Sequence, residues 1–169
     1  MPENLRVAGL AAGFEYFAQP FLLQARLNPR RTRINVEPEY LLFVDRDRVR
    51  LDAKLTYAIH GAKAHALKIS MSGWQLDRVE PENLVAAEGI ESDEKGVWSI
   101  PLVEPASGTV ELRLMAQQPL AAAATAISVA LPQPQGTASV SAVVAVSPAD
   151  NVSAGEIGYV ERRLERRNF

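Results

Sequence analysis

Residues 48–59, with the sequence RVRLDAKLTYAI, alternate polar and apolar side chains almost from end to end. Successive side chains of a β-strand point to opposite faces of a sheet, so this pattern predicts a long strand with one buried and one solvated face. Burial contributes about 1.5–3 kcal/mol for each large apolar side chain, so a core accounts for the pattern without any functional demand. The residues expected to face the core are Val49, Leu51, Leu55, Tyr57 and Ile59.

The same alternation continues on both sides of this stretch. Residues 39–44 are predicted to form a strand, and Asp45, Arg46 and Asp47 supply turn chemistry between the two. After residue 59, the sequence HGAK at 60–63 indicates another turn, and residues 64–72 then alternate again. Two long half-buried strands joined by a short glycine-containing loop predict an antiparallel hairpin.

Further short alternating runs occupy residues 98–102, 110–114, 127–131 and 140–146, with turn residues between them. This spacing predicts an all-β fold, an antiparallel two-sheet β-sandwich formed by a single domain over residues 1–169. Residues 1–12 and 160–169 are expected to be flexible or linker-like. The sequence PLAAAATA at 119–126 fits either one short helix or a loop, and 156–169 fits either a strand or a short helix. Around Pro20, an aromatic segment suits an edge strand or one that crosses between sheets.

Composition excludes several classes of protein. The chain has no cysteine, which removes disulfide scaffolds, cysteine-based zinc modules and thiol nucleophiles. A net charge of −2 gives no overall attraction to nucleic acid, and no apolar run reaches the roughly 20 residues of a membrane-spanning helix. The apolar run at 7–12 is too short for a typical signal sequence. The chain is therefore expected to be either cytoplasmic or a piece of a longer exported protein, and we favour the second, with a periplasmic or extracellular location.

Catalytic signatures are missing from the sequence. It contains no G-x-S-x-G elbow, no glycine-rich phosphate loop and no H-E-x-x-H motif, so we expect neither an enzyme nor a bound cofactor or metal. His60 and His65 bracket the predicted turn at 60–63, but two ligands fall short of an ordinary zinc site. Two arginine clusters are expected to serve as solvated surface or inter-domain contacts rather than nucleic-acid contacts. They comprise Arg30, Arg31 and Arg33, and Arg162, Arg163, Arg166 and Arg167.

Four residues are candidates for ligand binding. Trp74 and Tyr40 could serve as flat platforms for a sugar, and Asp93 and Glu94 lie in an acidic loop that could supply oxygen ligands to calcium. The competing interpretation places Trp74 in the core, because Leu76 would share its face, and treats the acidic residues as turn formers. Solvent exposure of Trp74 discriminates between these alternatives, since a buried indole cannot stack on a sugar.

From residue 33 to residue 116 the chain has an extended segment, a long amphipathic hairpin, a pair of strands around Gly73 and Trp74, an acidic loop, and the strands GVWSIPL and GTVELRL. This order resembles the non-catalytic β-sandwich modules of large multidomain bacterial envelope proteins. It is also similar to the N-terminal sandwich domain of zinc aminopeptidases, whose zinc motif this sequence lacks. The resemblance implies a structural or protein-interaction module whose partners are other domains of the same chain or another protein. The alternative is a carbohydrate- or calcium-binding module.

Overall fold

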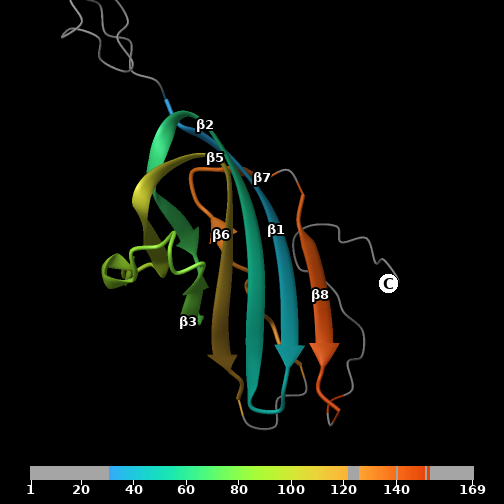
Figure 1. Ribbon diagram of the computed structural model, residues 1–169. Coiled ribbons are helices and arrows are strands. Elements are labelled where there is room, and N and C mark those ends of the chain that lie inside the picture. Colours follow the sequence, from blue (N-terminus) through green and yellow to red (C-terminus); the bar gives the residue numbers. More distant parts are fainter. Residues whose placement is uncertain (1–30, 122–125, 140, 151, 153–169) are drawn as a thin grey trace, which may run out of the picture.

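The computed structural model describes residues 31–121, 126–139, 141–150 and 152 (Figure 1). The described chain consists of strands and irregular segments with a single 3₁₀ turn, Ala87–Gly89. The long strands are β1 (Arg33–Val44), β2 (Arg48–Ser70) and β5 (Val97–Pro119). The shorter strands are β3 (Gln75–Glu80), β4 (Glu91–Ser92), β6 (Gln133–Pro134), β7 (Ala138–Ser139) and β8 (Val143–Pro148).

All of these strands belong to one mixed sheet, in the order β3-β5-β2-β1-β7, with β4 on β5, β6 on β2 and β8 on β1. The predicted all-β character is confirmed. Among the described residues the expected antiparallel two-sheet sandwich is not found, because β7 and β8 run parallel to β1 and all the strands join one sheet. The parallel pairing follows from a long connection that returns the chain from β5 to the far side of β1.

β2 and β5 form one antiparallel ribbon along the whole molecule. Each is 23 residues long, and they stay paired from Arg48↔Pro119 at one end to Ser70↔Val97 at the other. The predicted hairpin between 48–59 and 64–72 is therefore wrong, since both stretches lie in one strand and share the partner β5. The predicted break between the strands at 98–102 and 110–114 is likewise bridged within β5.

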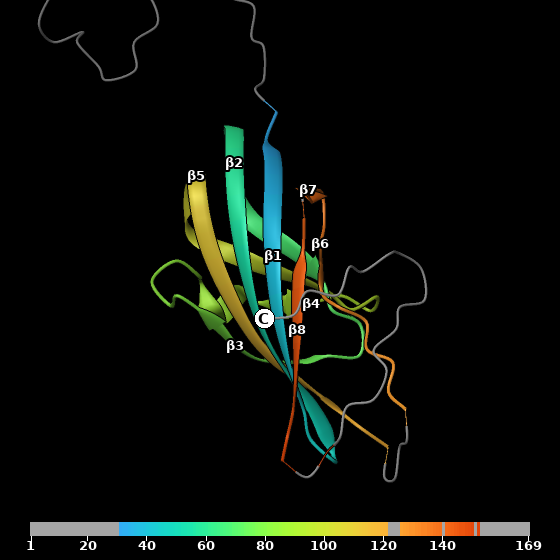
Figure 2. The ribbon, with the colours of Figure 1, turned by 90° about the vertical axis from the view of Figure 1, so that its right-hand side faces the viewer.

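The ribbon bends where both strands carry extra residues. Residues 60–63 of β2 lie opposite Ser107 alone, and residues 102–105 of β5 lie opposite His65 alone, so the two bulges follow one another and compensate. Gly61 and Gly108 have φ values of 84° and 82°, a conformation that side chains disfavour and that sharp bends need. The far halves of β2 and β5 thereby turn back across the inner face of β1 and the near halves (Figures 1 and 2).

A single core fills the concave side of this bent sheet. The alternation of residues 48–59 is confirmed, with Leu55 and Tyr57 fully buried, and residues beyond the bend join the same cluster. The large side chains with under 2% exposure include Leu55, Tyr57, Ile59, Leu67, Ile69, Met71, Ile100, Leu112 and Leu114. β2 and β5 thus supply most of the fully buried large side chains, on both sides of the bend.

The later part of the chain departs from expectation. Residues 127–131, predicted as a strand, pair with no other strand, and β6, which follows them, pairs with Ile69 and Ser70 of β2. For 119–126, predicted as a short helix or a loop, the structure shows that Pro119 ends β5, and residues 122–125 lie outside the described residues. The predictions for 1–30 and 153–169, including the aromatic segment around Pro20 and the tail arginines, also lie outside them.

Leu55 and Lys54 test the inner and outer faces of β2. We expect Leu55→Ala to lower the free energy of unfolding by about 2–5 kcal/mol, because it leaves a cavity in the core. Lys54→Ala, the matched control on the exposed face, should cost no more than about 1 kcal/mol despite its ion pair with Glu111. Urea denaturation measures both values, and equal losses would contradict the register.

Gly61 and Gly108 test the bend. A Cβ added at Gly61 would overlap the backbone carbonyl oxygen of Arg31, whereas one at Gly108 would meet no atom within 4 Å. Gly108→Ala should therefore cost about 1–2 kcal/mol, the usual penalty of the left-handed conformation. Gly61→Ala should cost more in the same denaturation experiment. A Gly61→Ala protein as stable as its Gly108→Ala counterpart would mean that the approach of Arg31 does not constrain the bend.

Candidate functional site

Both aromatic candidates for sugar binding lie inside the fold. Trp74 and Tyr40 are each 5% exposed, and each donates a hydrogen bond to a backbone carbonyl of the segment that follows β5. The Trp74 Nε1–H bonds to the carbonyl oxygen of Ala130 at 2.6 Å, and the Tyr40 hydroxyl bonds to that of Pro132 at 2.5 Å. A face buried in this way is not open to a sugar ring, which favours the core interpretation of Trp74.

These two hydrogen bonds hold residues 127–134, here called the cover segment, across the open side of the core. Val129 and Leu131 pack against the core, and Pro132 is fully buried. Just beyond the segment, the Gln135 amide donates to the Lys68 carbonyl at 2.7 Å. The apolar alternation at 127–131 thus reflects an extended segment lying on the core, held by side chains instead of a ladder.

Tyr57, a third aromatic residue of the core, makes no such hydrogen bond. Its ring is fully buried, and its hydroxyl finds no hydrogen-bond partner among the described residues. Burial raises the pKa of Tyr40 to about 12, and burial together with the nearby Tyr40 raises the pKa of Tyr57 as well. Both phenols are therefore neutral at physiological pH, and neither is poised to act as a base.

The acidic loop forms a turn. Asp93 Oδ1 accepts hydrogen bonds from the amides of Lys95 and Val97, each at 2.9 Å, which closes the connection into β5. Glu94 is exposed in the same turn. Within the described ranges, no three His, Cys, Asp or Glu side chains gather closely enough to hold a metal ion, and His60 and His65 are both exposed at the bend. The arrangement of Asp93 is that of a turn former.

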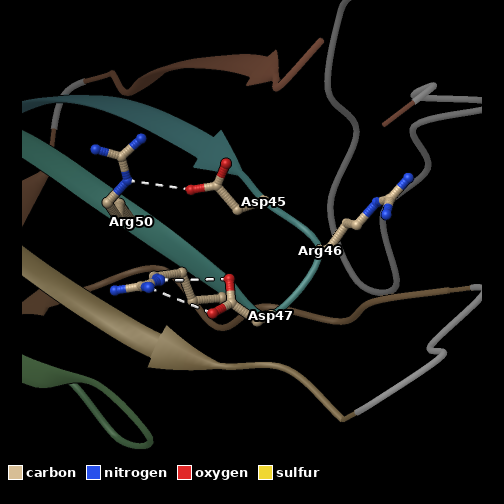
Figure 3. Close-up of a pocket in the computed structure, with 5 residues that line it drawn as sticks. Asp45, Arg46, Asp47 and Arg50 are labelled. Atoms are coloured by element: carbon tan, nitrogen blue, oxygen red, sulfur yellow. Dashed lines mark hydrogen bonds and ion pairs between the residues drawn. The ribbon is translucent and has the colours of Figure 1, made fainter. Parts of the chain in front are cut away.

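An open depression lies at the tip of the β1–β2 hairpin (Figure 3). It is lined by Asp45, Arg46, Asp47, Arg48 and Arg50. Arg50 pairs with Asp45 and Arg48 with Asp47, each at 3.3 Å, while the side chain of Arg46 points away from both pairs. Because both carboxylates are engaged by guanidinium groups, this site favours the contact of charged surfaces over acid–base chemistry. The signal available in the sequence was the alternating charge of residues 45–50.

Cross-strand ion pairs continue over the convex face of the sheet. Lys54 Nζ lies 2.9 Å from Glu111 of β5, and Arg113 Nε donates to Asp52 at 2.7 Å. The hydrogen bond to Glu111 raises the pKa of Lys54, and that to Asp52 raises the pKa of Arg113. Opposite charges across neighbouring strands stabilise a sheet modestly and leave its face polar.

No helix within the described ranges is long and apolar enough to cross a membrane.

Tyr57 and Tyr40 offer a matched test of the buried hydroxyls. Tyr57→Phe should leave the free energy of unfolding within about 0.5 kcal/mol of wild type, or raise it, because an unpaired buried hydroxyl is removed. Tyr40→Phe should lower it by about 1 kcal/mol, because the Pro132 carbonyl loses its donor. Chemical denaturation measures both, and a loss for Tyr57→Phe at least as large as that for Tyr40→Phe would contradict this assignment.

A comparison with models of known protein families finds no match for this chain, and a comparison with curated proteins finds none that is significantly similar.

Proposed function

We propose that this chain is a non-catalytic structural or protein-interaction module that acts by surface contact. One observation carries the proposal: Tyr40 and Trp74, the side chains best suited to hold a ligand, instead hold the cover segment by hydrogen bonds to Pro132 and Ala130. Because these two aromatic side chains stabilise the fold and are not open to a ligand, they favour a structural module over a protein with a binding cleft.

The convex face supplies the contact surface. It presents the ion pairs of Lys54 with Glu111 and of Arg113 with Asp52, and the hairpin tip adds Arg46 beside two further pairs. Surface ion pairs contribute about 0–1 kcal/mol each to stability, so a face so rich in them is better explained by solubility and partner choice than by folding. The expected partners are other domains of a larger chain or a separate protein.

A thermal-shift screen of the purified protein against calcium, EDTA and a panel of oligosaccharides tests the proposal. We expect no change in Tm with any of them. A ligand that binds only the native state raises its stability in step with ligand concentration. A dose-dependent rise with calcium or a sugar would contradict the proposal and support a carbohydrate- or calcium-binding module.

Two variants locate the site of any change in Tm that calcium causes. If calcium raises the Tm by binding at the acidic loop, Asp93→Asn should abolish that rise. Asp47→Asn is the control, because it removes a surface carboxylate at the hairpin tip, away from that loop. Neither change alone should alter the Tm measured without ligand by more than a few degrees, since a loss of about 1 kcal/mol corresponds to roughly 2–4 °C in a protein of this size.

A further inference from the structure

The cover segment is attached to the molecule differently from the long strands. Its residues 127–132 pair with no strand, and the side chains of Trp74 and Tyr40 hold it through the carbonyls of Ala130 and Pro132. β2, by contrast, is paired with β1 on one side and with β5 on the other. Detaching the cover segment therefore breaks a few side-chain contacts, whereas detaching a strand of the sheet breaks a whole ladder.

Two prolines explain why the cover segment has so little pairing. Pro132 and Pro134 carry no amide hydrogen and cannot donate to a ladder. β6, at the end of the segment, consists of Gln133 and Pro134, so only Gln133 has an amide to donate. Proline also restricts φ in the detached chain, which lowers the entropy that docking costs. The sequence thus favours a segment that can leave the core and return to it.

The burial of the cover segment is uneven. Pro132 is fully buried, Val129 and Leu131 are half-buried, and Ile127, at its start, is 41% exposed. The core of β2 and β5 is fully buried by comparison, and it is joined by a ladder on both sides of the bend. Parts of a protein with few buried contacts and little backbone pairing open at a lower free energy than its core.

We propose that the cover segment acts as a strap that leaves the core as a unit while β1, β2 and β5 stay folded. Its two hydrogen-bonded carbonyls are two residues apart, and such carbonyls lie on the same side of an extended chain. One outward movement therefore breaks both bonds.

Opening changes what the concave side presents to solvent. Trp74 and Tyr40, each 5% exposed in the closed structure, lose their carbonyl partners and become accessible together. The cover segment thus controls access to two hydrogen-bond donors and to the apolar side chains that Val129 and Leu131 cover. This device goes beyond the proposed function, whose contact surface lies on the convex face.

Thiol labelling of the native protein measures the opening, because the chain has no cysteine of its own. Pro132→Cys places a reporter in the cover segment. Val36→Cys is the matched control, at a fully buried position of β1 between β2 and β7. The Pro132→Cys thiol should react at least about tenfold faster than the Val36→Cys thiol. Its rate should also depend less on urea, because opening the segment exposes less surface than global unfolding.

Tyr40→Phe tests what holds the cover segment closed. Added to Pro132→Cys, it should raise the labelling rate about fivefold, the factor that corresponds to one ordinary hydrogen bond. Tyr57→Phe is the matched control and should leave the rate unchanged, because the Tyr57 hydroxyl has no partner among the described residues. Leu131→Cys keeps both prolines and serves as a second reporter, whose rate should show the same weak dependence on urea.

Two outcomes would overturn the inference. If both reporters in the cover segment matched Val36→Cys in rate and in urea dependence, the segment would open only when the whole fold unfolds. If Tyr40→Phe left the labelling rate unaltered, the bond to Pro132 would not hold the segment closed. Far-UV circular dichroism and the Tm identify a reporter variant that fails to fold, and the other reporter then decides. The ligand screen is a separate measurement, so failure here leaves the proposed function standing.

Discussion

The fold depends on the pairing of β2 with β5 through the bend. If the ladder ended at Ile59 and Gly108, the residues beyond would form a separate hairpin with its own edges and would need their own packing partners. Because the ladder resumes at Ala64↔Ala106, the far half of the ribbon is formed by the same two strands as the near half, and its register is set relative to it. The core then closes between the two halves of this ribbon, with further side chains from β1.

This arrangement determines what the remaining side chains do. The concave side is mainly apolar, and two of its aromatic residues, Tyr40 and Trp74, hold residues 127–132, which pair with no strand. The convex side carries the charged residues of β2 and β5, which pair with one another between strands. Tyr40, Tyr57 and Trp74 thus lie in the core while the charged side chains of β2 and β5 lie on the outer face, and this division supports the proposal of a contact module.

Sequence patterns predicted the faces of the strands but not their connections. The alternation around Leu55 identified the buried face correctly because side-chain period is a local property. The glycines at 61 and 108 were interpreted as chain reversals, since a positive φ serves a turn and a bulge equally well. Only the pairing of the two bulges, which lie far apart in sequence, distinguishes one from the other.

The sequence predicted the candidate site only in part, for the same reason. The spacing of Trp74 to Leu76 favoured its burial over the alternative of a sugar platform, whereas its bond to Ala130 could not be foreseen, because residues 127–131 have the alternation of a strand. The pairing of Asp45 with Arg50 depends on the geometry of the hairpin tip, which charge alternation alone does not specify. A local pattern predicts which face of the sheet a side chain occupies, whereas its hydrogen-bond or ion-pair partner depends on the tertiary fold.

The parallel pairing of β8 with β1 has a consequence for the order of folding. β1 and β2 are joined by a tight turn and can meet early, whereas β8 must find β1 across nearly the whole described chain. Closing so long a loop costs entropy that is recovered only when the contact forms, so non-local pairings tend to assemble late. During synthesis the β8-facing edge of β1 therefore stays open until β8 has been made, and β1 is most exposed to wrong partners in that interval.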